Sequence, residues 1–278
     1  MACLGAAAQS DADRAKSDAT HKDSRKESVS PPRNESPNEA QNEAQNEAYK
    51  ASRNDSRRSG HAFMSPALQA LQNDDRANPA FLWVQGGEEQ FQRRCAACHS
   101  PASLRGVATR YPAFDGPQRR VLTLSARIDQ CRQQHLQAKP LAAEDDELLG
   151  LEAFVALQSR GLPVQAVKDP RLNATLQQGK RLWNQRLGQL DLSCAQCHDD
   201  NAGARLGGST VPQGHATGYP LYRLEWQALG SLARRLRNCM TGVRAEAFAA
   251  DSAEFTALAL YLRQRAAGMP LDAPAVRP

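Results

Sequence analysis

The sequence lacks any run of about twenty consecutive apolar residues, which is the length that a membrane-spanning helix needs. It also lacks a block of lysine and arginine interleaved with aromatic residues, so nucleic acid is not an expected partner. No stretch alternates convincingly between apolar and polar residues, which is the pattern of a half-buried strand. The chain is therefore expected to be all-α and to have no transmembrane segment.

Cysteine is present, but its distribution does not suit a disulfide framework. The count of seven is odd, and four of the seven fall into two CxxCH groups. Cys3 stands alone near the start of the sequence, and Cys131 and Cys239 are widely separated single cysteines. A small scaffold held together by disulfides is not expected from this arrangement.

The first 60 residues are polar and charged, and they include the repeat NEAQNEAQNEA. Such a segment buries too little apolar surface to offset its ordering entropy, so residues 1–60 are predicted to be a disordered extension. The opening MACLGAAAQS is too short for a signal peptide and lacks a basic start. A start site assigned too late is the preferred explanation for the missing signal peptide.

From residue 61 the sequence divides into two similar halves, 61–165 and 166–278. Each half has a helix-like stretch, a CxxCH group, a loop rich in Gly, Pro and Ser, a basic segment that ends in a cysteine, and a closing helix. The basic segments are ARIDQC, which ends at Cys131, and RRLRNC, which ends at Cys239. Two all-α domains related by internal duplication are the predicted architecture.

The closing helices are predicted from apolar spacing and from end signals. The first covers about residues 143–160, begins with acidic residues that suit a helix N-terminus, and ends before Gly161. The second is predicted to begin at Asp251, because Glu254 three residues later completes a capping-box pattern, and to end before Gly268.

The two CxxCH groups are the strongest chemical signal of the sequence. In such a group two cysteines on one turn can bond to both vinyl groups of a haem, and the adjacent histidine can bind the iron, so the pattern indicates c-type haem attachment. The first group consists of Cys95, Cys98 and His99, and the second of Cys194, Cys197 and His198. Zinc would need a second ligand pair of similar spacing, and a thioredoxin-like pair would need a βαβ context, neither of which is found.

Each haem iron then needs a second axial ligand or an open position. Methionine, histidine and thiolate are the common choices. The candidates outside the repeated pattern are Met64, His135, His215, Met240 and Met269, and both histidines are expected to be surface residues. Cys131 and Cys239 occupy equivalent places before the closing helices, where small cytochrome c folds deliver their distal ligand. This equivalence points to thiolate ligation of both haems.

The segments RLWNQRLGQLDLSCAQCHDD and RRLRNCMTGVRAEAF closely resemble the SoxA family of dihaem cytochromes, which belong to the thiosulfate-oxidising Sox system. The resemblance covers about residues 80–270. It implies that Cys95 and Cys98 hold the first haem and that Cys194 and Cys197 hold the second. The implied axial pairs are His99 with Cys131 and His198 with Cys239.

The same resemblance implies the reaction and its partners. Cys239 would be the reactive centre and carry a persulfide, and Arg235 would contact the substrate. The reaction would be the oxidative conjugation of thiosulfate to a cysteine of SoxY in the SoxYZ carrier, that is, an L-cysteine S-thiosulfotransferase activity. The monohaem cytochrome SoxX would complete a heterodimer, and covalent haem attachment would place the protein in the periplasm.

The spacing of Arg235 and Cys239 suits this chemistry. Residues four apart lie on one face of a helix, and an apolar stripe of Leu229, Leu232 and Leu236 predicts a helix here. A guanidinium on that face can offer paired donors to sulfonate oxygens and favour a thiolate nearby. Three further arginines either add positive field or form a solvated basic face: Arg234, Arg237 and Arg244.

Two other functions fit parts of the pattern. A dihaem electron-transfer protein without its own substrate explains the CxxCH groups, but it leaves the spacing of Arg235 and Cys239 without a role. A thiosulfate dehydrogenase that forms tetrathionate would need no carrier protein. The modification state of Cys239 after turnover distinguishes these functions from conjugation.

Overall fold

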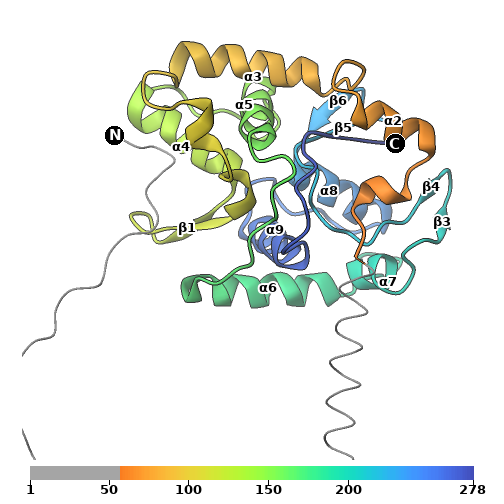
Figure 1. Cartoon of the computed structure of the whole chain (residues 1–278). Helices are drawn as coiled ribbons and strands as arrows, with labels where there is room; N and C mark the ends of the chain where they lie inside the picture. Colours follow the sequence, from red (N-terminus) through yellow and green to blue (C-terminus); the bar gives the residue numbers. More distant parts are fainter. Residues whose placement is uncertain (1–56) are drawn as a thin grey trace, which may run out of the picture. The chain divides into compact units, whose positions relative to one another are not determined.

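Helices build most of the fold, as Figure 1 shows for the computed structural model, which describes residues 57–278. The predicted extension up to residue 56, its repeat and Cys3 lie outside the described residues. The first half contains α2 (Pro66–Asn73), α3 (Phe81–Arg94), α4 (Leu124–Leu136) and α5 (Asp146–Leu157). The second contains α6 (Asn173–Asn184), α7 (Cys194–His198), α8 (Leu232–Gly242) and α9 (Ala253–Arg265). The expectation of a predominantly helical fold is confirmed.

Each half has one close helix crossing at a glycine. α3 packs against α5, and α6 packs against α9. A Cβ on Gly87 would lie 2.0 Å from the carbonyl oxygen of Gly150, and a Cβ on Gly179 would lie 2.0 Å from that of Ala257. Only a residue without a side chain allows the backbones to approach so closely, so the same device holds the first and closing helices of both halves together.

The closing helices begin and end close to where the sequence predicts. Asp145 caps α5 by accepting a hydrogen bond from the backbone N–H of Glu147 at 2.9 Å. The predicted cap of the second closing helix is wrong by one residue. Ser252, not Asp251, accepts from the N–H of Phe255 at 3.2 Å and caps α9. A serine hydroxyl satisfies this orphan donor as well as a carboxylate does, which is why the pattern alone misplaced the cap.

Short strands, which the sequence did not predict, accompany the helices. They form the antiparallel hairpins β1–β2 (Ala113–Asp115, Arg120–Leu122), β3–β4 (Arg205–Leu206, Ser209–Thr210) and β5–β6 (Leu221–Arg223, Ala228–Gly230), and β7 (Ala275–Arg277) pairs in parallel with β5. Strands of two or three residues are too short to leave an alternating pattern. Leu229 therefore belongs to β6 and not, as predicted, to the apolar stripe of a helix.

The hairpins β1–β2 and β5–β6 are equivalent parts of the two halves. Each has one residue at positive φ at the end of its turn, Arg119 at 51° and Gln227 at 50°. Each leads directly into a helix whose cap is a hydroxyl, Thr123 for α4 and Ser231 for α8. These correspondences, together with the repeated glycine crossings, confirm the internal duplication that the sequence predicts.

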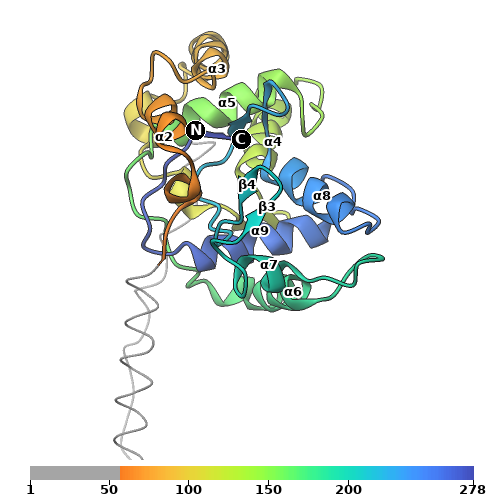
Figure 2. The ribbon, with the colours of Figure 1, turned by 90° about the vertical axis from the view of Figure 1, so that its right-hand side faces the viewer.

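The two halves share a core and form one compact unit from Arg58 to Pro278. One hydrophobic cluster combines Ala156 and Val164 with residues that follow α9, among them Met269. Figure 2 shows α5 and α4 above α9 and α6 in this unit. The boundary between 61–165 and 166–278 remains a prediction. Within residues 57–278 no helix is long and apolar enough to cross a membrane.

Candidate functional site

The second CxxCH group forms a helix of its own. Ser193 caps α7 and accepts from the N–H of Gln196 at 3.2 Å, while the Gln196 side chain accepts from the N–H of Ser193 at 2.8 Å. This reciprocal capping box fixes a helix of only five residues, which carries Cys194, Cys197 and His198. The group is thus presented on one rigid turn, as haem attachment requires.

The ring of His198 is oriented by its neighbours. Its Nδ1 donates to the carbonyl oxygen of Pro212 at 2.7 Å, which leaves Nε2 with a free lone pair. Trp183 packs beside the ring at 5.6 Å between centroids and donates from Nε1 to Asp199 at 2.8 Å. A fixed tautomer with a lone pair on Nε2 is the form of histidine that binds a metal.

Cys239 and Arg235 lie together on α8, as the spacing predicts. Leu236 and Met240 bury the neighbouring face of this helix in a cluster with Trp183 and Phe255. Arg235 and Cys239 consequently face a pocket of about 150 Å³, which is also lined by His198. The pocket is closed mainly by apolar and aromatic side chains, including Trp183, Tyr219, Leu221, Leu232 and Leu262.

The structure brings the thiol of Cys239 opposite the imidazole of His198, and the two side chains hydrogen bond. Burial alone would raise the pKa of Cys239. Hydrogen bonding with His198 and the positive charges of Arg235 and Arg223 outweigh burial, so the pKa lies below its ordinary value. A thiolate is therefore favoured at this position.

Of the four arginines that the sequence singles out, only Arg235 lines this pocket. Arg234 stacks on Trp226, with its guanidinium carbon 4.2 Å from the ring centroid. Arg237 and Arg244 are exposed. Of the two roles that the sequence allowed for these three arginines, the structure therefore favours a basic surface over a place in the pocket.

Three residues that sequence reasoning missed also line the pocket: Tyr219, Arg223 and Arg277. Burial raises the pKa of Tyr219 to about 12, so its hydroxyl keeps its proton. The donors of Arg277 are occupied by Gln72, Asp272 and the carbonyl oxygen of Val276. Arg223 sits at the end of β5, and no local pattern in the sequence marks it.

The first CxxCH group differs in its local structure. Cys95 to Cys98 form turns directly after α3, and Cys98 is exposed. Nε2 of His99 is buried without a hydrogen-bond partner. Burial lowers the pKa of His99, and the nearby His135 at the end of α4 adds to this effect. His99 therefore lies near the helix that carries Cys131.

The other candidate axial ligands of haem iron differ in their burial and in their distance from the pocket that Cys239 lines. His135 is exposed, as expected, whereas His215 is half-buried and lines the pocket beside Cys239, so a surface position for it is wrong. Met64 lines the same pocket. Met240 and Met269 are buried in hydrophobic clusters. His198 and Cys239 remain the pair that faces each other.

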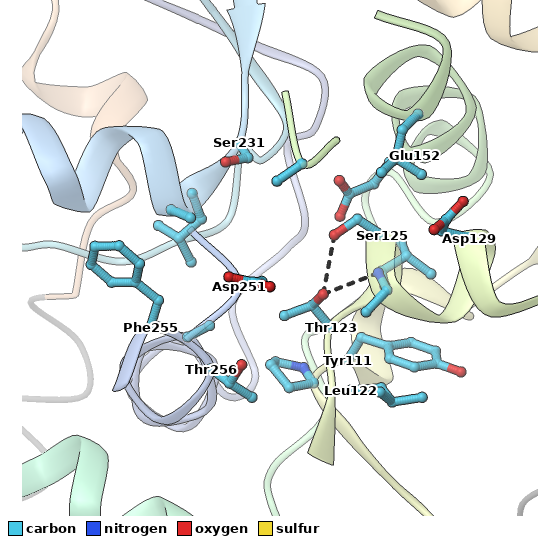
Figure 3. A pocket seen from close by; sticks show the side chains of 18 of the residues that line it. Tyr111, Leu122, Thr123, Ser125, Asp129, Glu152, Ser231, Asp251, Phe255 and Thr256 are labelled. Carbon is cyan, nitrogen blue, oxygen red and sulfur yellow. Dashed lines mark hydrogen bonds between the residues drawn. The ribbon is translucent and has the colours of Figure 1, made fainter. Parts of the chain in front are cut away.

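A second, larger pocket lies between the two halves and is shown in Figure 3. It measures about 710 Å³, and Ser125, Asp129 and Glu152 line one side while Asp251 and Phe255 line the other. Burial and the charge of Glu144 raise the pKa of Glu152 to about 7. Neither cysteine nor histidine lines this pocket, so the predicted site residues all lie elsewhere.

The residues present fit a haem better than a bare metal ion. Haem iron takes its equatorial ligands from the porphyrin and needs only axial ligands from the protein. The second half offers two cysteines on one turn and a facing pair, His198 and Cys239, and the first half offers the buried Nε2 of His99, which lacks a partner. Among residues 57–278 no group of three or more His, Cys, Asp or Glu side chains is arranged to hold a metal ion.

Comparison with known proteins decides the family. The family described as SoxA/TsdA, cytochrome c domain, matches residues 81–164 and 178–271. The chain belongs to this family. Each matched segment contains one CxxCH group, so both halves are cytochrome c domains and the family implies covalently bound haem c. The resemblance to SoxA that the sequence suggests is confirmed.

The curated relatives are SoxA subunits. The subunit named "L-cysteine S-thiosulfotransferase subunit SoxA" from Pseudaminobacter salicylatoxidans is 33% identical over 229 residues, which is 79% of this chain and 80% of the relative. The subunit of that name from Paracoccus pantotrophus is 30% identical over 227 residues, which is 79% of this chain and 78% of that relative. The crystal structure of SoxXA from P. pantotrophus matches with a TM-score of 0.77 at 30% identity, over 80% of this chain and 87% of that chain.

Proposed function

We propose that this SoxA/TsdA family member is an L-cysteine S-thiosulfotransferase subunit. It would join thiosulfate oxidatively to a cysteine of a SoxY-type carrier, in the SoxYZ complex, during sulfur oxidation. The observation that carries the proposal is the placement of Cys239, whose thiol faces His198 and shares one pocket with Arg235. The names of the SoxA relatives support the same activity.

The proposal assigns two haem c groups. Cys95 and Cys98 would hold the first, with His99 and Cys131 as axial ligands. Cys194 and Cys197 would hold the second, with His198 and Cys239 as axial ligands. Haem c supplies a one-electron acceptor beside the thiol and a route for electrons out of the pocket. The first half would serve electron transfer or structure.

Arg235 would bind the sulfonate oxygens of thiosulfate and leave the sulfane sulfur directed at Cys239. A disulfide bond forms between the Cys239 thiolate and this sulfur as two electrons are removed. The thiolate of the carrier cysteine then attacks the sulfane sulfur, so that the thiosulfate group moves to the carrier and Cys239 leaves as a thiolate. Hydrolysis of the adduct's S–SO₃ bond would instead release sulfate and leave a persulfide on Cys239.

The partners follow from this chemistry and from the structural match. A SoxX-type monohaem cytochrome would take up electrons as the second subunit of a heterodimer, since the matched crystal structure is that of a SoxXA complex. Covalent haem attachment supports a periplasmic location. The domain assignment is a first cytochrome domain at 61–165 and a second, active one at 166–278.

Mass spectrometry of Cys239 tests the proposal. Haem-loaded protein is incubated with thiosulfate and the cytochrome partner, and peptides containing Cys239 are weighed before and after carrier is added. A thiosulfate or single-sulfur adduct that disappears as the carrier cysteine gains mass is the expected result. Tetrathionate formed without carrier, with Cys239 unmodified, would indicate a thiosulfate dehydrogenase instead.

The variant Cys239→Ala provides the second arm. It should lose thiosulfate-dependent carrier modification while haem stays attached to both CxxCH groups. Its control is Cys131→Ala, the equivalent change in the first half, which should still form the adduct on Cys239 when ferricyanide supplies the oxidant. Full turnover by Cys239→Ala would show that the role assigned to this cysteine is wrong.

A further inference from the structure

The two halves differ at one position of their equivalent hairpins. Asp115 is the last residue of β1, and Arg223 is the last residue of β5. Both strands pair in the same register with the strand that leads into the cysteine-bearing helix, since Asp115 lies opposite Arg120 and Arg223 lies opposite Ala228. A negative charge in the first half is thus replaced by a positive charge in the second.

In the first half the arginine of the basic segment is neutralised. Arg127, the counterpart of Arg235, lies 3.4 Å from the carboxylate of Asp115, whose side chain is 2% exposed. Gln130 connects the pair, because it accepts from Arg127 at 2.8 Å and donates to Asp115 at 3.2 Å. The charge of Arg127 is therefore satisfied within the protein, and no anion is needed beside it.

In the second half no carboxylate takes that place. Arg223 and Arg235 line the same pocket, and Arg235 forms no salt bridge with any residue in 57–278. Arg223 is 8% exposed, and its Nε is buried without a hydrogen-bond partner. Among the described residues its one ion pair is with Glu225, whose side chain is 60% exposed and lies outside the pocket lining.

Two guanidinium groups thus share a small, mostly apolar pocket. Burial and the charge of Arg235 lower the pKa of Arg223, which reflects the cost of holding like charges close together. Such an arrangement is stabilised by an anion that both groups can bind, and a dianion compensates two charges better than a monoanion does.

We infer that Arg223 is a second substrate-binding residue, which holds the anionic end of the substrate together with Arg235. The inference rests on the proposed function and deepens it. Two planar donor groups suit a tetrahedral sulfonate with three oxygens, and they leave its sulfane sulfur free to face Cys239. The change from Asp115 to Arg223 would be what gives only the second copy a site for thiosulfate.

Anion binding by the haem-loaded heterodimer tests this inference without turnover. Thiosulfate and sulfate are titrated by calorimetry into the wild type and into Arg223→Gln, with the exposed Arg237→Gln as a control that removes the same charge from α8. Arg223→Gln should raise both dissociation constants at least about tenfold, the effect of losing one charge-assisted hydrogen bond. Arg237→Gln should leave both nearly unchanged.

Two further variants guard against a merely structural effect. Arg223→Lys keeps the charge and should recover part of the affinity. Arg223→Asp reproduces the pair of the first half and should weaken binding more than Arg223→Gln, because the new carboxylate neutralises Arg235. In steady-state assays Arg223→Gln should raise KM for thiosulfate more than it lowers kcat. Unchanged circular dichroism and haem content verify that the variants fold.

Unaltered dissociation constants in Arg223→Gln would overturn the inference. So would a wild type that binds nitrate as tightly as sulfate, a measurement that needs no variant. Either result is separate from the proposed function, which depends on adduct formation at Cys239. If the wild type binds sulfate and thiosulfate through Arg223 but Cys239 never gains mass, the proposed reaction fails and the anion site stands.

Discussion

Gly214 lies close to the side chains of His198 and Trp183, and its replacement gives a sharp test of the second site. The residue has a φ of +71°, which a side chain rarely adopts. A Cβ here would lie 2.7 Å from Cη2 of Trp183 and 3.3 Å from Cβ and Cγ of His198. Gly214→Ala therefore forces either the tryptophan or the histidine to move.

The magnitude has two parts, and a matched variant separates them. The left-handed backbone costs about 1–2 kcal/mol once a Cβ is present. Overpacking against the two rings adds about 1–3 kcal/mol. Gly203 has a φ of +93° but nothing within 4 Å of its would-be Cβ, so Gly203→Ala carries only the first cost.

Thermal or urea unfolding of the haem-loaded variants measures the total, and the visible and electron paramagnetic resonance spectra report on the ligation of the haem that we propose for the second half. Gly214→Ala should lose about 1–3 kcal/mol more stability than Gly203→Ala and should alter the spectra, whereas Gly203→Ala should leave them as in the wild type. Equal losses and identical spectra in both variants would refute the packing of Gly214 against His198 and Trp183.

Three further predictions concern the parts of the fold that surround this site. Asp115→Asn leaves the partly buried Arg127 without its carboxylate and should lower the free energy of unfolding by about 3 kcal/mol in urea titrations. The raised pKa of Glu152, about 7, means that folding disfavours its charged form, so stability should fall by about 2–3 kcal/mol between pH 4.5 and 7. Glu152→Gln should remove this part of the pH profile. Gly179→Ala should lower the melting temperature strongly, because of its 2.0 Å clash, while Gly86→Ala, in open space on a helix, should raise stability by about 1 kcal/mol.

The sequence predicted what depends on local spacing. Three features follow from residues that are close together in the sequence, within about two helical turns. They are the CxxCH groups, the positions of the closing helices, and the shared face of Arg235 and Cys239. The exact cap of α9 did not follow, because Ser252 and Asp251 are both good caps and only the backbone conformation selects between them.

Contacts between distant segments were not predicted. Arg277 reaches the pocket because β7 pairs with β5, more than fifty residues upstream, and no pattern in either strand signals that pairing. The hairpins escaped notice because their strands have only two or three residues each. Without the hairpin, nothing in the sequence sets residue 115 beside residue 127, so the neutralisation of Arg127 could not be seen.

A duplicated domain would be expected to carry the same chemistry twice, since both copies place an arginine four residues before a cysteine on equivalent helices. The arginine alone therefore cannot be what distinguishes the copy that is proposed to be active. The difference lies in its neighbour, because a buried carboxylate cancels the charge of Arg127 and a second cation reinforces that of Arg235. An anionic substrate would then find a binding site in only one half, although both halves carry the residues for haem. On this proposal the hairpin sets substrate specificity, through a strand residue that lies beside the arginine and cysteine common to both halves.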